Sequence, residues 1–178
     1  MRTLFSFALI AFFAFDAMPQ SKNPSFEEVI SLRSVGNPVI SPDGKIVALA
    51  MRTTDWESNE FDTEIWISKD GNEAFPATRS AKGSSTSPAF SPDNKWLAFL
   101  SDRDGKNQIY VMRTEGGEAF PITNEKESIS DLDWAPSGRS IFFIKSEKED
   151  KTKKDTEKRY GGFAVDDAEF TLSHLWEV

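Results

Sequence analysis

The segment Ser41-Pro42-Asp43-Gly44-Lys45 recurs as Ser91-Pro92-Asp93-Asn94-Lys95 and again as Ala135-Pro136-Ser137-Gly138-Arg139. The first positions of the three copies are 50 and 44 residues apart. Each copy has the chemistry of a tight turn, because proline presets φ at the second position and Gly or Asn tolerates the left-handed conformation at the fourth. Turns that return at such a period predict a repeat architecture.

Each turn lies between two predicted strands. The apolar runs that follow the turns are hydrophobic on both faces, which favours strands covered on both sides: Ile46 to Met51, Trp96 to Leu100 and Ile141 to Ile144. The stretches that precede the turns supply one further strand each: Pro38-Val39-Ile40, Pro88-Ala89-Phe90 and Leu132-Asp133-Trp134.

Two more strands follow in the first two copies. Glu64 to Ile67 aligns with Gln108 to Val111, and Glu73 to Thr78 aligns with Glu118 to Thr123. The unit is therefore four strands in about 45 residues, which is the period of a β-propeller blade.

The repeat predicts an all-β fold, a partial β-propeller over residues 37–178 with blades at about 37–79, 80–124 and 125–178. Propeller rings close with about 4 to 8 blades, and closure protects the strand edges. About three four-stranded blades are too few to close a ring, so we expect this chain to be a fragment of a longer protein.

The third copy carries an insertion. His174-Leu175-Trp176 stands where Ile65 and Ile109 stand in the earlier copies, but 22 residues later than the second copy predicts. The extra residues lie at about 146–167 and include a mixed-charge run from Lys145 to Arg159. One interpretation is a hairpin extension whose charges keep it in water. The other is a flap over the propeller mouth, or a contact with another domain or subunit.

The first residues differ from the rest of the chain. Arg2 precedes an apolar run from Leu4 to Phe15, too short for a span of about 20 residues and typical of a secretory signal peptide. We expect a signal at residues 1–20, with a retained anchor or a buried helix as alternatives; Phe15 makes an imperfect cleavage site after Ala17. Residues 21–36 form the lead-in, where Ser25 and Glu28 predict a capping box for a short helix over about Phe26 to Arg33.

Composition excludes several classes of function. The chain has 178 residues, 38% of them hydrophobic, with 15 Phe and 5 Trp, which suffices for a core. Its net charge of −8 argues against a nucleic-acid partner, which would need a basic face. It contains no cysteine, so disulfides, thiolate metal sites, a cysteine nucleophile and a lipid-modified cysteine are ruled out.

We expect no catalytic, cofactor-binding or metal-binding residue in this chain. It contains no Gly-x-Ser-x-Gly motif, and Gly83 to Ser87 is interpreted as a loop before a strand. The single histidine, His174, is interpreted as an ordinary strand side chain. The remaining acidic candidates lack metal-site spacing and are explained by helix capping or turn chemistry: Glu27-Glu28, Asp102 to Gly105 and Asp166-Asp167.

One part of the chain resembles the repeat that TolB-type propellers share with the prolyl oligopeptidase family of serine peptidases. This part runs from Leu97 to Gly105 and continues through Gln108 to Met112 and Gly116-Gly117. The order of a signal peptide, a short helix near Glu27 and a first Ser-Pro-Asp-Gly turn is similar to the start of the peptidases. Together with Arg159-Tyr160-Gly161-Gly162, it is most similar to the acylaminoacyl peptidase and dipeptidyl peptidase 5 branch. The resemblance covers about Ser25 to Val178.

This resemblance implies a secreted or periplasmic enzyme whose Ser-His-Asp triad lies in an α/β-hydrolase domain beyond Val178. The propeller would then admit short or unfolded peptides to that domain, with no cofactor and no stable membrane insertion once the signal is removed. The alternative is a TolB-like periplasmic propeller that acts as a protein-binding module.

Overall fold

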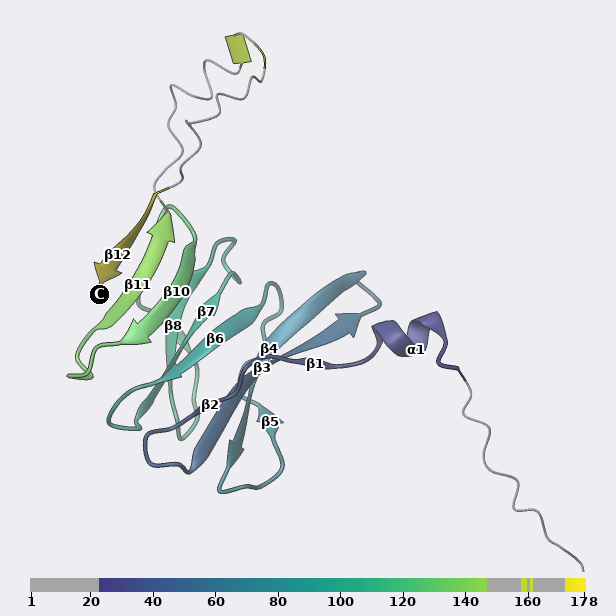
Figure 1. Cartoon of the computed structure of the whole chain (residues 1–178), viewed down its shortest axis with the longest axis horizontal. Helices are drawn as coiled ribbons and strands as arrows, with labels where there is room; N and C mark the ends of the chain where they lie inside the picture. Colours follow the sequence, from purple (N-terminus) through teal and green to yellow (C-terminus); the bar gives the residue numbers. More distant parts are fainter. Residues whose placement is uncertain (1–22, 147–157, 160, 162–171) are drawn as a thin grey trace, which may run out of the picture.

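The computed structural model describes residues 23–146, 158–159, 161 and 172–178. Three antiparallel sheets lie face to face in sequence order, after a short helix α1 (Phe26–Ile30) (Figure 1). The first sheet comprises β1 (Ser34–Val35), β2 (Val39–Ile40), β3 (Ile46–Asp55), β4 (Glu60–Lys69) and β5 (Phe75–Pro76). The second comprises β6 (Ser85–Phe90), β7 (Trp96–Ser101), β8 (Gln108–Arg113) and β9 (Phe120–Pro121). The third comprises β10 (Ile129–Trp134), β11 (Ile141–Ser146) and β12 (Ser173–Glu177).

These sheets are successive blades, and the predicted all-β partial propeller is confirmed. In the second blade the strands pair in the order β6-β7-β8-β9, the meander expected for one blade. The first blade has the same order from β2 to β5. It also has an extra strand that the sequence did not predict: β1 pairs with the far end of β3, through Val35 opposite Met51.

The proline turns adopt the predicted conformation. Their fourth residues have positive φ: 74° at Gly44, 62° at Asn94 and 65° at Gly138. In the second turn the Ser91 hydroxyl donates to the Asp93 carboxylate at 2.7 Å, and the same carboxylate accepts the Lys95 N–H at 3.1 Å. These two hydrogen bonds lower the pKa of Asp93 below its usual value, with the Ser91 hydroxyl as the larger cause.

Neighbouring turns also contact one another across the blades. The side-chain oxygen of Asn94 accepts the backbone N–H of Asp43 at 3.0 Å. The position of a Cβ on Gly138 lies 3.5 Å from the ring of Pro92. The repeated turns therefore form a continuous row along one end of the blades.

The middle blade carries the core because its strands alternate between two buried faces. One face joins the first blade in a cluster of Ala48, Ile65, Ile67, Leu97, Phe99, Tyr110 and Met112. The other joins the third blade in a cluster of Ala98, Leu100, Ile109, Val111, Ile129, Leu132, Ile141 and Phe143. The prediction that both faces of Trp96 to Leu100 are covered is thus confirmed.

Strands β3 and β11 differ from this expectation, since within the described residues only one of their faces is covered by another sheet. In β11, Ile141 and Phe143 are buried against the second blade, while Phe142 and Ile144 point to the other side and are only half-buried. On the same outer face, Leu175 of β12 is 70% exposed. These strands therefore carry apolar side chains on a second face that no described sheet covers.

The helix is shorter than predicted. The capping box is confirmed, with the Ser25 hydroxyl accepting the Glu28 N–H and the Glu28 carboxylate accepting the Ser25 N–H. The helix ends at Ile30 instead of about Arg33, because the Ile30 carbonyl accepts the Thr54 hydroxyl at 2.6 Å and the chain then turns into β1.

The aromatic side chains divide into two groups. Phe99 and Phe143 pack between blades, and the Trp134 indole N–H donates to the Ala89 carbonyl of the neighbouring blade at 3.1 Å. Several others remain about half exposed in the described structure: Trp56, Phe61, Phe75, Phe120 and Trp176. No helix among the described residues is long and apolar enough to cross a membrane.

Candidate functional site

The β3–β4 and β7–β8 hairpins, the end of β11 and the start of β12 all lie at the end of the blades opposite the proline turns (Figure 1). We call this end the hairpin face. The β3–β4 hairpin is the longest of those described, with ten-residue strands, whereas β7 and β8 have six residues each. Most of the predicted insertion lies outside the described residues, and its ends join here, where Ser146 pairs with Ser173.

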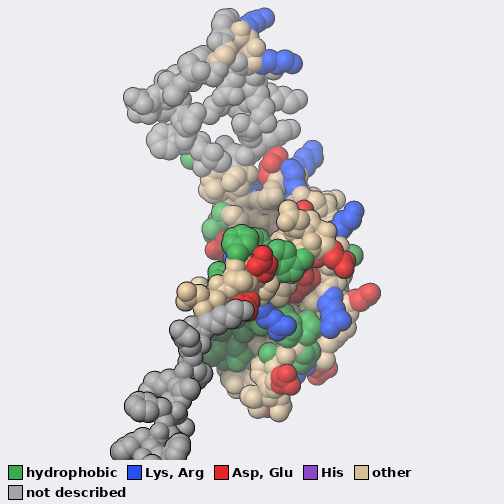
Figure 2. All heavy atoms as spheres, turned by 90° about the vertical axis from the view of Figure 1, so that its right-hand side faces the viewer, with side chains coloured by type: hydrophobic (Ala, Val, Ile, Leu, Met, Phe, Trp, Pro, Cys, Tyr) green, Lys and Arg blue, Asp and Glu red, His purple; other side chains and the backbone are tan. Residues whose placement is uncertain are grey.

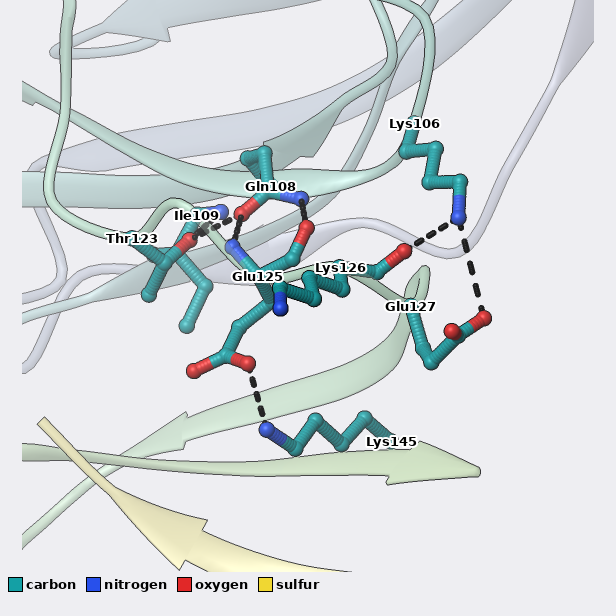
Figure 3. Close-up of polar contacts among 8 residues, drawn as sticks. All are labelled: Lys106, Gln108, Ile109, Thr123, Glu125, Lys126, Glu127 and Lys145. Carbon is teal, nitrogen blue, oxygen red and sulfur yellow. Dashed lines mark hydrogen bonds and ion pairs between the residues drawn. The ribbon is translucent and has the colours of Figure 1, made fainter. Parts of the chain in front are cut away.

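A polar cluster holds the loop between the second and third blades on the hairpin face (Figure 3). The side-chain oxygen of Gln108 accepts the Thr123 hydroxyl at 2.9 Å and the Glu125 N–H at 2.8 Å. Its side-chain nitrogen donates to the Glu125 carbonyl at 3.1 Å. The Thr123 hydroxyl also accepts the Ile109 N–H at 2.9 Å, so each group of this cluster has a partner.

The first blade contains the same arrangement one repeat earlier. The Glu64 carboxylate accepts the Thr78 hydroxyl and the Ser80 N–H, and the Thr78 hydroxyl accepts the Ile65 N–H at 2.8 Å. Glu64 is 7% exposed. We call this hydrogen-bonded unit the clasp: a Glu or Gln in the third strand of a blade, with a Thr 14 or 15 residues later. The sequence analysis missed it, although Gln108 and Thr123 repeat the pair of Glu64 and Thr78 with one residue more between them.

Replacing Thr123 with valine tests the clasp. The change removes the hydroxyl at nearly constant shape and leaves the Ile109 N–H without its acceptor, so we expect a loss of about 1–3 kcal/mol in unfolding free energy. The measurement is chemical denaturation of the purified propeller-containing protein. Thr123→Ser restores the hydroxyl and should recover most of the loss; equal losses in both variants would contradict the role of the clasp.

A pocket of about 650 Å³ opens beside the second clasp, bounded by the loop at 124–127 and by Lys145, Ser146, His174 and Trp176. Lys145 forms an ion pair with Glu125, and its ammonium group lies 4.0 Å from the centre of the Trp176 ring. Only 15% of the Lys145 side chain is exposed. The second blade therefore holds the loop through Gln108, and the third blade holds it through Lys145 (Figure 3).

The residues considered as catalytic candidates have structural partners. Glu28 caps α1. Asp102 accepts the Ser84 N–H at 2.6 Å, and Asp104 accepts the Tyr110 hydroxyl. Burial, followed by this bond to Asp104, raises the pKa of Tyr110 to about 12. His174 lies in β12, in the wall of the pocket.

Two further expectations have other outcomes. The interpretation of Gly83 to Ser87 as a loop was wrong in part, because β6 begins at Ser85 and is interrupted by an irregularity in register between Thr86 and Ala89. Asp166-Asp167 lies outside the described residues. Within the described ranges no three acidic or histidine side chains gather as metal ligands.

Comparison with known proteins places this geometry in a family. The sequence model of the TolB β-propeller domain family (PD40) matches residues 25–161. This range includes the three proline turns and both clasps. The chain belongs to the TolB β-propeller family. This TolB-type propeller is 37% identical over 135 residues to an uncharacterized peptidase, YuxL, of Bacillus subtilis, a match that covers 74% of the chain and 20% of YuxL.

Two other proteins are similar to this chain, one in sequence and one in fold. The Tol-Pal system protein TolB of Syntrophotalea carbinolica is 32% identical over 51 residues, covering 29% of this chain and 12% of that protein. The acylaminoacyl peptidase of Pyrococcus horikoshii shares the fold with a TM-score of 0.60 at 17% identity, covering 84% of this chain and 23% of that one. The chain thus spans about a fifth of the length of the two peptidases that it matches.

Proposed function

We propose that this chain is the amino-terminal part of the propeller of a secreted or periplasmic serine peptidase of the prolyl oligopeptidase type. In this proposal residues 1–20 are a signal peptide, residues 21–36 the lead-in helix, and residues 37–178 the first blades. The 37% identity to a protein named as a peptidase, sustained over 135 residues, is the observation that carries the proposal.

The open outer faces of the first and third blades support the existence of further blades. Ile40 of β2 is 65% exposed and Leu175 of β12 is 70% exposed, on sheets whose other faces are packed. A blade stacked on each face would bury these side chains, at about 25 cal/mol per Å² of apolar surface removed from water. In the whole enzyme these blades would close a ring through which peptides reach the hydrolase domain.

The surface around α1 suits a contact with that hydrolase domain. Phe26 and Leu32 are 72% and 71% exposed, and Trp56 and Phe61 of the β3–β4 hairpin are 52% and 55% exposed. Hydrophobic side chains are visible on the face of the molecule that Figure 2 shows. The Trp56 indole N–H donates to the Ser31 hydroxyl at 3.2 Å, which joins the hairpin to the end of the helix. An apolar surface of this kind is typical of interaction sites.

The decisive experiment compares two proteins. We expect the isolated 178-residue chain to release no chromophore from chromogenic dipeptide and acyl-amino acid substrates. The full-length product of the extended reading frame should hydrolyse such substrates and lose activity with a serine-directed inhibitor. Its downstream sequence should encode the remaining blades, then Gly-x-Ser-x-Gly, Asp and His in that order.

A reading frame that ends after ring closure without a nucleophile motif would contradict the peptidase proposal. It would favour the second candidate, a TolB-like protein-binding module, which the local 32% identity to a TolB protein supports.

A further inference from the structure

The junction between the second and third blades departs from the repeat at one aromatic position. Tyr110 pairs with Phe99 across β7 and β8, and Trp176 pairs with Phe143 across β11 and β12. Phe99 and Phe143 each lie eight residues after the first position of their proline turn, so Trp176 is the equivalent of Tyr110. Tyr110 is 2% exposed, whereas Trp176 is 46% exposed. The position is therefore covered in one junction and open in the next.

An arginine and small hydroxyl side chains close the first of these junctions. The Arg103 guanidinium lies 4.4 Å from the centre of the Tyr110 ring. The same guanidinium donates to the hydroxyls of Ser101 at 3.0 Å and Ser85 at 3.3 Å. From the loop between the blades, the Ser80 hydroxyl lies 3.5 Å from that of Ser85. Contacts from the loop and from the β7–β8 turn therefore meet beside the ring.

Charged side chains take the corresponding place in the second junction (Figure 3). Glu125 is the equivalent of Ser80, because each donates its backbone N–H to the clasp residue of the preceding blade. The longer side chain of Glu125 reaches Lys145 of the third blade, whose ammonium group lies over the Trp176 ring. The ion pair thus spans a space that hydroxyl groups close in the first junction, and the pocket of about 650 Å³ opens there.

The pocket has the size and the mixed lining of a ligand site. Its volume lies within the range of about 300–1,000 Å³ that is usual for such sites. Its wall presents the half-exposed indole and charges of both signs, from Glu125, Glu127, Lys126 and Lys145. The largely buried ion pair leaves both groups capacity for a ligand, since an ammonium has three donors and a carboxylate about four acceptor sites. Because burial of such a pair costs desolvation free energy, stability alone does not account for it.

We propose that this pocket binds a short zwitterionic peptide that carries an aromatic or aliphatic side chain. The ammonium group of the peptide binds Glu125, its carboxylate binds Lys126 and Lys145, and its side chain packs on the Trp176 ring. A zwitterion matches a wall with both signs of charge, and an apolar side chain removes the exposed indole surface from water. All of these residues lie in this chain, and the inference goes beyond the proposed function because it requires no hydrolase domain.

Isothermal titration calorimetry of the full-length protein with the dipeptide Gly-Phe tests the proposal. Prior treatment with a serine-directed inhibitor removes turnover of the probe. We expect saturable binding of Gly-Phe. N-acetyl-Gly-Phe-amide keeps the ring but has no charged termini, so it should bind at least roughly tenfold more weakly. Gly-Gly keeps the termini but has no ring, so it should bind roughly three- to tenfold more weakly. No saturable binding of Gly-Phe, or equal binding of the capped peptide, would overturn the proposal.

Substitutions in the pocket locate the binding site. Trp176→Ala should weaken the binding of Gly-Phe roughly three- to tenfold, and Glu125→Gln roughly tenfold. Phe75→Ala is the matched control, because Phe75 is 45% exposed but lies in the first blade, and it should leave the affinity unchanged. Unchanged affinity in both pocket variants would place the binding elsewhere and overturn the proposal. The peptide series needs no variant, so it decides the matter even where a substitution prevents folding.

The two proposals fail separately. A full-length protein that binds Gly-Phe in this pocket but hydrolyses no chromogenic substrate would support the pocket and contradict the peptidase. A protein that hydrolyses those substrates, and whose pocket variants bind Gly-Phe as the unaltered protein does, would support the peptidase and overturn the pocket.

Discussion

Replacing Phe99 with alanine is expected to lower the unfolding free energy by about 3–5 kcal/mol, the usual cost of emptying a buried aromatic site. Phe99 is fully buried between the first two blades, where its ring stacks on Tyr110 with centroids 6.0 Å apart. Neighbouring strands are held by hydrogen-bonded ladders on both sides of the site, so they can relax only partly into the cavity. A loss of this size is a large part of a total stability of about 5–15 kcal/mol.

The matched control is Phe61→Ala, at a position that is 55% exposed at the end of the β3–β4 hairpin. This variant loses mainly the contact with Arg52, whose guanidinium lies 4.5 Å from the ring centre, and should cost less than about 1 kcal/mol. Urea denaturation of the purified propeller-containing protein measures both. Similar losses for the two variants would mean that the second blade is not the packed centre described above.

Gly83→Ala is expected to destabilise the protein by clearly more than Gly71→Ala, although both glycines have a φ of 72°. A Cβ on Gly83 would lie 2.5 Å from an Asp102 carboxylate oxygen and 2.9 Å from the backbone N of Arg103, whereas a Cβ on Gly71 would meet nothing within 4 Å. Gly71→Ala therefore measures the backbone cost alone, about 1–2 kcal/mol.

The additional cost at Gly83 comes from displacing the β7–β8 turn. Asp102 accepts the Ser84 N–H at 2.6 Å, and the Ser84 carbonyl accepts the Ser101 hydroxyl at 2.8 Å, so a shift of the turn breaks contacts on both sides. We expect about 1–3 kcal/mol beyond the Gly71 variant, measured as the difference between their denaturation midpoints at constant slope. Equal denaturation midpoints for the two variants would show that the loop at residue 83 accommodates the additional Cβ without strain.

The features that could be predicted from sequence are those with local chemical causes. The proline turns could be predicted because Pro42 and Gly44 each favour a particular backbone angle. The start of the helix could be predicted because the side chains of Ser25 and Glu28 each accept the other residue's backbone N–H. Strand order followed from the repeat, since one blade predicts the next.

The features that escaped prediction depend on contacts between distant residues. Nothing within Ser34–Val35 distinguishes a strand from a loop, and β1 forms because β3 extends far enough to pair with it. The clasps were missed for a related reason, because Glu64 and Thr78 meet only after the blade has folded. Half-burial of β11 likewise depends on which neighbours are present, which its own sequence does not record.

The two hydrophobic clusters have no member in common, although the middle blade contributes alternate residues of the same strands to both. Leu97 and Ala98 are adjacent in sequence yet belong to different junctions. Substitutions in separate junctions, such as one at Met112 and one at Ile141, should therefore lower the unfolding free energy additively, as is usual for sites without shared partners. The side chains of one junction can accordingly be substituted without changing the packing of the other junction.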